Sequence, residues 1–327
     1  MLNKKLLLSS LIIILLLGLV GCEKNDDLNN LDEVTLVLDW YPNTNHTGFY
    51  VAEERGYYAE EGLIINIIQP SDGGTAQLIA AEQGDFGISY QEEVTLARAK
   101  EIPVVAIATI IQHNTAGYAS PLEKNITSPK DFINKTYGGA GTPSETALLK
   151  VVMDNHQQDS GSITQLNIGS ADFFTSIKKD IDFSLIYYGW TGIEAEVRSI
   201  PINFIPLKDE DERLDFYTPL IIANENKIQN EAALIARFLR ATSKGYEYAI
   251  NNPKEAANIL IKAVPELNPD LVIASQKYLA NEYKSEAARW GEMEVNTWES
   301  FTNFMLEHKL INNRIDSMAA FTNEFLP

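Results

Sequence analysis

Residues 86–111 read FGISYQEEVTLARAKEIPVVAIATII, and the fold class is clearest in this stretch. The apolar runs at 86–89 and 104–111 have the length and composition of buried strands, and the amphipathic segment 92–100 between them is typical of a helix. A strand, a helix and a second strand in succession predict two parallel strands with the helix packed on the face of their sheet. We therefore expect an α/β protein.

The same alternation continues on both sides of this stretch. Further strands are predicted at 34–38, 64–68, 136–137, 164–168, 183–186 and 204–206, and further helices at 47–55, 75–83, 144–155, 171–179 and 192–198. Beyond Pro219 an apolar strand at 220–223 precedes a tail in which apolar residues recur at helical spacing over 231–250 and 270–283. Pro253 restarts a helix within this tail.

The strands and helices fall into two sets, which are joined at 112–120. About 300 residues exceed the usual size of a single core, so two lobes are expected. The predicted divisions are 34–112 for the first part of lobe 1, 113–216 for lobe 2 and 217–327 for the return strand and terminal helices of lobe 1. Crossings at 112–115 and 215–218 would then form a two-strand hinge, with a ligand cleft between the lobes.

The start of the chain is typical of an export signal. Two lysines precede an apolar run at 6–20, which is shorter than the roughly 20 apolar residues that a permanent membrane span needs. The tetrapeptide LVGC, which ends at Cys22, resembles a bacterial lipobox, in which the cysteine is acylated and becomes the mature N-terminus. We expect a signal peptide at 1–21, a lipid on Cys22 and a flexible tether at 22–33.

The charge of the chain argues against several functions. Residues 1–21 hold two lysines and no acid, so their removal takes the formal charge from −19 to −21. Nucleic-acid binding depends largely on Lys and Arg contacts to phosphate, so we expect none. Attachment to an anionic membrane must come from acyl chains, of which two or more anchor a protein stably. With Cys22 acylated, no thiol remains for a disulfide, a metal or a nucleophile.

Motifs of catalysis are missing from the sequence. The four histidines form no HExxH pair, and neither a G-x-S-x-G elbow nor a Walker loop occurs, so we expect no metal and no cofactor. The run GGAGTPS at 138–144 lies between a predicted strand and a predicted helix, where backbone amides can receive an anion. It lacks the GxGxxG spacing and any lysine, and a tight turn is an equal alternative.

A resemblance to known proteins is carried by LDWYPNTNHTGFYVA at 38–52, DFGISYQEEVTLAR at 85–98 and YYGWTGIEAE at 187–196. These stretches resemble the substrate-binding proteins of ABC importers for thiamine pyrimidine precursors, within a larger family that includes sulfonate- and nitrate-binding proteins. The resemblance implies a type II periplasmic-binding fold, no catalytic activity, and a ligand such as hydroxymethylpyrimidine or formylaminopyrimidine. It also implies ABC permease subunits as partners and a monomeric, lipid-anchored receptor on the extracytoplasmic face of a bacterial cell membrane.

Several alternatives keep the fold and change the activity. The cargo could be a sulfonate, nitrate or riboflavin, although an anion would call for a cleft arginine and arginines are scarce in these motifs. The protein could also be an enzyme that acts on the pyrimidine, or a lipoprotein adhesin without a small ligand. The related eukaryotic pyrimidine synthases consume one of their own histidines with iron, but they carry a cysteine-rich segment that this chain lacks.

The loop after the first strand should face the cleft, because strand ends line the cleft in open α/β sheets. Trp40 offers a flat surface for stacking an aromatic ring, or packs under the loop. Asn43 and Asn45 can each donate and accept hydrogen bonds, but their neighbours also favour turns, so we expect one of them to be structural and include Asn43. His46, which could instead cap the next helix, completes the predicted set in this loop.

A second group of predicted site residues follows later strands. Tyr90 supplies a ring and a hydroxyl, and Gln91 supplies an amide. In lobe 2, Tyr188 and Trp190 follow a strand and could sandwich a planar ligand against lobe 1 when the cleft closes. Glu194 lies four residues after Trp190, on the same face of a helix, unless it is simply solvated. Its carboxylate could accept a hydrogen bond from an exocyclic amine, in a charge-assisted contact roughly twice as strong as a neutral one.

Overall fold

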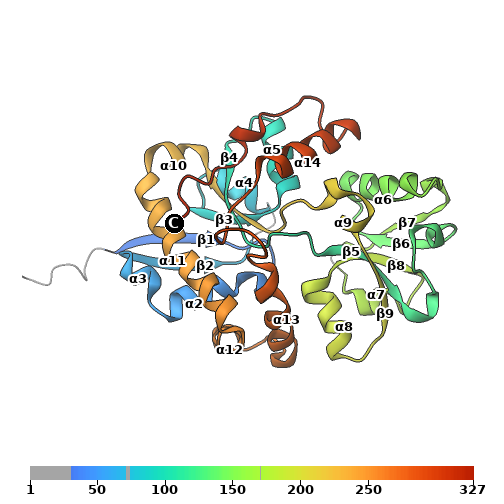
Figure 1. The fold of residues 1–327 in the computed structure, drawn as a ribbon, viewed down its shortest axis with the longest axis horizontal. Coiled ribbons are helices and arrows are strands. Elements are labelled where there is room, and N and C mark those ends of the chain that lie inside the picture. The colour runs from blue at the N-terminus through green and yellow to red at the C-terminus, as the bar shows by residue number, and fades with distance from the viewer. Residues whose placement is uncertain (1–30, 71–73, 170) are drawn as a thin grey trace, which may run out of the picture. The chain divides into compact units, whose positions relative to one another are not determined.

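The computed structural model describes residues 31–70, 74–169 and 171–327 (Figure 1). Cys22, the predicted signal peptide at 1–21 and most of the predicted tether lie outside the described residues. Within the described part of the chain, no helix combines the length and the hydrophobicity needed to cross a membrane.

The first sheet has the strand order β2-β1-β3-β10-β4. Its strands are β1 (Asp32–Val37), β2 (Leu63–Ile68), β3 (Phe86–Ser89), β4 (Val104–Thr109) and β10 (Leu220–Asn224). β1 and β3 are parallel, but β10 lies between β3 and β4 and is antiparallel to both. The two strands of the stretch 86–111 are therefore parallel to each other, as predicted, but the sheet is mixed, because a strand from far along the chain lies between them.

The second sheet has the strand order β7-β6-β8-β5-β9. Its strands are β5 (Ala116–Pro121), β6 (Thr136–Gly139), β7 (Thr164–Asn167), β8 (Phe183–Tyr187) and β9 (Ile202–Pro206). β6 pairs in parallel with β7 and β8, whereas β5 is antiparallel to β8 and β9. β5 occupies residues that were predicted as a joint. Its sequence, AGYASP, has no β-branched residue, yet all six residues are buried.

Helices cover both faces of each sheet (Figure 1). In β1, Val34 and Leu36 pack in one apolar cluster with α2 and α11, and Val37 packs in another with α4, α5 and α14. The helices are α2 (Thr47–Glu54), α3 (Tyr57–Glu60), α4 (Thr75–Ala80), α5 (Gln91–Ala99), α6 (Pro143–Asn155), α7 (Phe173–Ser176), α8 (Ile193–Val197), α9 (Leu207–Glu210), α10 (Glu225–Asn230), α11 (Ala232–Asn251), α12 (Pro253–Ala263), α13 (Pro269–Glu282) and α14 (Val295–Glu307).

We call the first sheet with its helices lobe 1 and the second sheet with its helices lobe 2. The two-lobed α/β fold predicted from the sequence is confirmed. The exact residues at which the predicted divisions begin and end stay predictions. α12 packs on α2 and α11, and α13 packs on α11 and α12, so both belong to the helical layer of lobe 1.

α2 and α11 touch through their backbones. A Cβ atom on Gly245 of α11 would lie 2.0 Å from the carbonyl oxygen of Gly48 in α2, closer than any real Cβ contact. This approach places Tyr246, the next residue of α11, under the loop that follows β1. The Tyr246 hydroxyl donates a hydrogen bond of 2.6 Å to the carbonyl oxygen of Asn45. Helix packing in lobe 1 thus determines where this loop lies.

The two crossings between the sheets are bonded to each other. The Asn114 backbone N–H donates to Asp215 Oδ1 at 2.7 Å, and its side-chain amide donates to the Leu214 carbonyl oxygen at 2.8 Å. His113 places Nδ1 2.6 Å from Asp215 Oδ2 and Nε2 3.0 Å from the carboxylate of Glu286. Because both ring nitrogens face carboxylates, the imidazole is best accommodated as a cation.

This arrangement predicts a pH dependence of stability. The hydrogen bond with Asp215 and then that with Glu286 raise the pKa of His113 from 6.5 to about 9, although burial opposes the rise. A pKa raised by folding stabilises the protein in full below pH 6.5, and this contribution is lost as the pH rises through about 9. We expect urea denaturation at pH 6 and pH 10 to show a larger loss of unfolding free energy for the wild type than for His113→Gln. Equal losses would contradict this role of His113.

Candidate functional site

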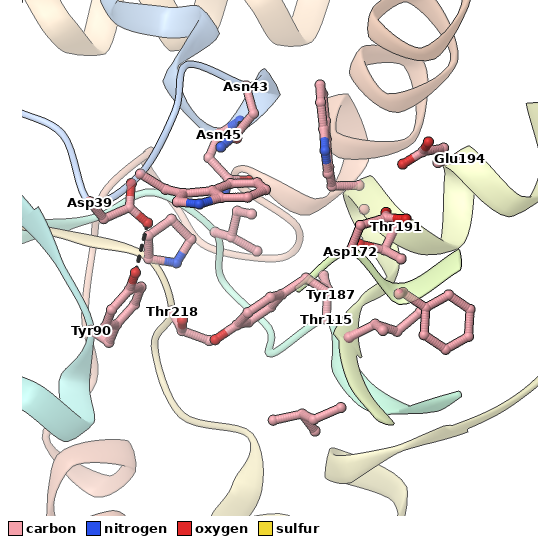
Figure 2. Close-up of a pocket in the computed structure, with 18 of the residues that line it drawn as sticks. Asp39, Asn43, Asn45, Tyr90, Thr115, Asp172, Tyr187, Thr191, Glu194 and Thr218 are labelled. Atoms are coloured by element: carbon pink, nitrogen blue, oxygen red, sulfur yellow. Dashed lines mark hydrogen bonds between the residues drawn. The ribbon is translucent and has the colours of Figure 1, made fainter. Parts of the chain in front are cut away.

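A cavity of about 390 Å³ is lined by residues of both lobes. It is bounded by the loop after β1, the start of α5, both crossings, the end of β8 and the start of α8 (Figure 2). The lining residues are Asp39, Trp40, Asn43, Asn45, Tyr90, Ile111, Thr115, Ala171, Asp172, Phe173, Leu185, Ile186, Tyr187, Gly189, Trp190, Thr191, Glu194, Thr218 and Pro219.

Asp39 provides a carboxylate on the lobe 1 side of the cavity. Its Oδ1 lies 2.8 Å from Nε2 of His46, and its Oδ2 accepts a hydrogen bond of 3.0 Å from the Tyr90 hydroxyl (Figure 2). Burial alone would raise the pKa of Asp39, but the interactions with His46 and Tyr90 outweigh it and lower the pKa below its ordinary value. Asp39 is therefore a carboxylate anion at neutral pH, and its remaining lone pairs can accept hydrogen bonds from a ligand.

His46 is fully buried and holds the Asp39 carboxylate in place through its Nε2 atom. The backbone N–H of Asn43 donates to Nδ1 of His46 at 3.2 Å, so Nδ1 carries a lone pair. Nε2 must then carry the proton and donate it to Asp39. Both ring nitrogens are occupied, and His46 is not part of the cavity wall. The structure places it as a support of the carboxylate.

Tyr90 and Gln91 are neighbours with different surroundings. Tyr90 lines the cavity, and burial, followed by the charge of Asp39, raises the pKa of its phenol well above the ordinary value. Its hydroxyl therefore stays protonated and donates. Gln91 is fully buried away from the cavity, where its Oε1 accepts from the backbone N–H of Tyr217 at 2.9 Å and its Nε2 donates to Thr297 at 3.2 Å. Gln91 thus fixes the returning crossing against α5.

Asn43 and Asn45 both line the cavity, and the first is occupied by its own turn. The Asn43 side-chain oxygen accepts from the backbone N–H of Asn45 at 2.8 Å, and its Nδ2 donates to the Tyr41 carbonyl at 3.0 Å. It caps the short helix η1 (Thr44–His46). Within the described chain, the side-chain amide of Asn45 makes no hydrogen bond and is free to contact a ligand (Figure 2).

Tyr187 lies across the cavity from Asp39, with its hydroxyl toward Thr218 (Figure 2). Its side chain is 44% exposed, and this exposure is toward the cavity that it lines. Protein atoms around the ring raise the pKa of Tyr187 to about 12 by desolvation, with a contribution from the charge of Glu92. The Thr218 hydroxyl is buried and faces the Tyr187 hydroxyl, whose pKa it lowers against the effect of burial, and both groups line the cavity.

Tyr188 points away from this cavity. Its hydroxyl donates to Glu196 at 2.5 Å, and its ring packs 4.8 Å from that of Phe204. It lines a separate, shallower hollow beside α8. Side chains alternate across a strand, and β8 runs one residue further than predicted, so Tyr187 rather than Tyr188 reaches the cavity.

The other predicted aromatic and acidic residues line the cavity. Trp40 is 45% exposed and meets Tyr41 edge-on at 5.7 Å between ring centroids. Trp190 belongs to the π-helical turn η5 (Tyr188–Gly192) and packs on the apolar cluster of α12 and α13. Glu194 follows in α8 and forms an ion pair of 3.0 Å with Arg198, one turn later. The pair with Arg198 involves Oε1 and leaves the second oxygen of Glu194 without a partner among the residues that the structure describes.

The electrostatic character of the cavity is acidic. Asp39, Asp172 and Glu194 line it, and no Lys or Arg is found among the lining residues that the structure describes. Over the described ranges, no group of three His, Cys, Asp or Glu side chains could hold a metal ion. The cavity therefore suits a neutral or cationic molecule with hydrogen-bond donors, and disfavours phosphates and sulfonates.

The glycine-rich run at 138–144 forms the turn into α6. Thr142 caps the helix, with its hydroxyl accepting from the backbone N–H of Glu145 at 3.1 Å. The Glu145 carboxylate in turn accepts from the backbone N–H groups of Gly141 at 2.9 Å and Thr142 at 3.3 Å. The amides that could have received an anion are thus occupied by the protein's own carboxylate, which favours the tight-turn interpretation.

The structure brings together five of the eight predicted binding residues at the cavity wall: Trp40, Asn43, Tyr90, Trp190 and Glu194. It places His46, Gln91 and Tyr188 elsewhere, for the reasons above. Their roles in binding stay predictions. The sequence prediction left out Asp39, Asn45, Thr115, Asp172, Tyr187, Thr191 and Thr218, which also line the cavity. The available signal for Asp39 was an acidic residue directly after a buried strand.

Comparison with known proteins adds the following similarities. The model of the NMT1/THI5-like family matches residues 43–256. A formylaminopyrimidine-binding protein of Halalkalibacterium halodurans is 28% identical, over 95% of this chain and 97% of that protein. A 4-amino-5-hydroxymethyl-2-methylpyrimidine phosphate synthase of Legionella pneumophila is 26% identical, over 90% and 92%. The periplasmic aliphatic sulphonate-binding protein SsuA of Escherichia coli matches in structure with a TM-score of 0.68, at 12% identity, over 88% of this chain and 97% of that chain.

Proposed function

Because this chain belongs to the NMT1/THI5-like family, we propose that it is a solute-binding protein that captures an aminopyrimidine precursor of thiamine. Its membership agrees with the resemblance carried by the sequence motifs. The similar protein of H. halodurans is named for binding formylaminopyrimidine, and the alignment covers nearly all of both chains. We take formylaminopyrimidine as the first ligand to test, with hydroxymethylpyrimidine as the second.

The observation that carries this proposal is the ionised Asp39 in a cavity without a lining Lys or Arg among the described residues. An aminopyrimidine presents an exocyclic amine next to ring nitrogens, so it offers donors to the carboxylate and acceptors to hydroxyl and amide groups. Asn45 and Thr218 supply such groups on other parts of the wall. A sulfonate or nitrate would instead face a carboxylate, with no Lys or Arg among the described lining residues to balance its charge.

Aromatic side chains of both lobes support a planar ligand. Trp40 comes from lobe 1, and Tyr187 and Trp190 come from lobe 2. Stacking adds about 0.5–1.5 kcal/mol per aromatic pair beyond the burial of area. A ligand that contacts both lobes stabilises the closed arrangement by its differential affinity for that arrangement.

We also propose that the protein is a lipoprotein of an ABC importer and hands its ligand to permease subunits. The LVGC tetrapeptide supports acylation of Cys22, and the two-lobed fold supports capture and release. Mass spectrometry of the protein isolated from bacterial membranes should find an acylated Cys22 at the mature N-terminus. An unmodified N-terminus would contradict the anchoring.

We propose further that the protein is not an enzyme, although several similar proteins, including that of L. pneumophila, are named as phosphate synthases. The acidic wall supports this, because a phosphorylated product or cofactor would need cations, and none lines the described cavity. Incubation of the protein with formylaminopyrimidine, followed by chromatography, should return the ligand unchanged.

Isothermal titration calorimetry tests the proposed function. We expect one formylaminopyrimidine per chain and a dissociation constant of about 1 µM or below, equivalent to about −8 kcal/mol. An alkanesulfonate and riboflavin serve as comparison ligands and should give no heat of binding. Tight binding of either one, without binding of a pyrimidine, would contradict the proposal and favour that cargo.

The two predicted binding residues of lobe 2 that line the cavity, Trp190 and Glu194, give a separate prediction. We expect Trp190→Ala and Glu194→Ala each to weaken binding at least tenfold, by loss of a stacking surface and of a charged acceptor respectively. Calorimetry gives the affinities, and circular dichroism checks that both variants fold. Tyr188→Phe is the matched control, because its hydroxyl bonds Glu196 outside the cavity, and its affinity should equal that of the wild type.

A further inference from the structure

One buried hydroxyl connects the two loops that face the cavity from opposite lobes. Ser275 lies in α13 and is fully buried. Its Oγ is 2.5 Å from the Thr44 hydroxyl in η1, next to the cavity residues Asn43 and Asn45. The same Oγ is hydrogen-bonded to the carbonyl oxygen of Gly189 in η5, next to Trp190.

The direction of these two hydrogen bonds is fixed by chemistry. A carbonyl oxygen only accepts, so the single hydroxyl hydrogen of Ser275 goes to Gly189. The Thr44 hydroxyl must then donate to Ser275. The result is a continuous relay from Thr44 of lobe 1 through Ser275 of α13 to the backbone of lobe 2. We call these three residues the Ser275 relay.

The Ser275 relay lies where the turn η5 packs closely on α13. A Cβ atom on Gly189 would lie 2.7 Å from a methyl group of Leu279, so the Leu279 side chain would have to shift for any larger residue at this position. The ring of Tyr188 meets that of Tyr278 at 5.5 Å. Trp190 packs against the apolar cluster that α12 and α13 form. The turn that carries Trp190 is therefore seated on lobe 1 at α13, beside the ligand cavity.

The Thr44 end of the Ser275 relay is also held by hydrogen bonds from lobe 1. The Tyr283 hydroxyl, also near the end of α13, donates to the Thr44 carbonyl oxygen at 2.5 Å. Tyr246 holds the next carbonyl, that of Asn45, from α11. The Thr44 hydroxyl and the carbonyl oxygens of Thr44 and Asn45 are thus each bonded to a hydroxyl group of a buried residue. Loss of one hydroxyl leaves buried partners unpaired, which is the costly case.

We propose that Ser275 is a positioning residue for the ligand site. It does not line the cavity, so it acts by fixing the distance between the loop that carries Asn43 and Asn45 and the turn that carries Trp190. This inference rests on the proposed function, because it concerns the same cavity. Its consequence is that part of the affinity depends on a contact formed without the ligand.

Ser275→Ala tests the proposal in two measurements. In the ligand-free protein, hydrogen exchange followed by mass spectrometry should show faster exchange in peptides covering 187–193, because the turn loses its bond to α13. Calorimetry with formylaminopyrimidine should show about tenfold weaker binding. The matched control is Thr242→Val, which removes another fully buried hydroxyl, bonded to the Tyr58 hydroxyl at 2.9 Å in the core of lobe 1. It should change neither measurement.

The outcomes separate the inference from the proposed function. Unchanged exchange at 187–193 in Ser275→Ala overturns the positioning role, whatever the affinity. Faster exchange with unchanged affinity overturns the link to the ligand site. If the wild type binds no formylaminopyrimidine, the proposed function fails, and the exchange comparison alone still decides whether the Ser275 relay holds the turn.

Discussion

Asp39→Asn should weaken the binding of formylaminopyrimidine about a hundredfold or more. The Asp39 carboxylate is ionised because the interactions with His46 and Tyr90 lower its pKa against the effect of burial. Asparagine keeps the shape but carries no charge, and its NH₂ group must face either the Nε2–H of His46, which can only donate, or the Tyr90 hydroxyl, which would have to turn and accept. The variant thus loses the acceptor for the ligand amine and disturbs the support of the loop.

The magnitude follows from the burial of the contact. Removing one partner of a buried, charged hydrogen bond costs about 2–5 kcal/mol, and a hundredfold loss of affinity is about 2.7 kcal/mol. Calorimetry measures the affinity. Asp159→Asn is the matched control, because Asp159 caps the short helix η4 (Ser160–Ser162) at the surface, and it should bind as the wild type does. An Asp39→Asn affinity within threefold of the wild type would remove Asp39 from the site.

Gly245→Ala should destabilise the protein by more than about 4 kcal/mol, or prevent folding. The added methyl group would stand 2.0 Å from the carbonyl oxygen of Gly48, and this obstacle is backbone, which cannot rotate away. α2 and α11 would have to separate, which would open the apolar core of lobe 1 around Phe49 and Phe238. The loop after β1 would also shift, because Tyr246 supports it.

Urea denaturation measures this effect. The matched control is Ala233→Leu, on the exposed side of the same helix, where more atoms are added. Because these atoms meet solvent, the control should stay within about 0.5 kcal/mol of the wild type. A Gly245→Ala variant as stable as this control would show that the two helices do not pack backbone to backbone.

The sequence predicted the class of fold because hydrophobic periodicity is a local signal. The strand at 86–89 and the helix restart at Pro253 were predicted at the positions found. The position of β10 was not predictable in the same way. Its five residues are all buried, which indicates a central strand but not which strands it separates. Pairing between residues more than a hundred positions apart is a property of the tertiary structure.

The individual binding residues could likewise be predicted only in part from the sequence. Loops after strands were expected to face the cavity, and Trp40, Tyr90 and Trp190 line it. The choice between Tyr187 and Tyr188 depended on whether β8 ends at residue 186 or at 187. Because the strand continues through 187, Tyr187 shares the face of Leu185, which also lines the cavity, and Tyr188 begins the turn η5. His46 could not be told from a ligand contact, because its bonds to Asp39 and Asn43 depend on the folded loop.

A crystal structure of the protein with formylaminopyrimidine tests the central claim most directly. We expect the pyrimidine ring to lie between Trp40 of lobe 1 and the aromatic side chains of lobe 2, with its exocyclic amine about 3 Å from a carboxylate oxygen of Asp39. A ligand bound outside this cavity, or held in it with the amine turned away from Asp39, would contradict the account.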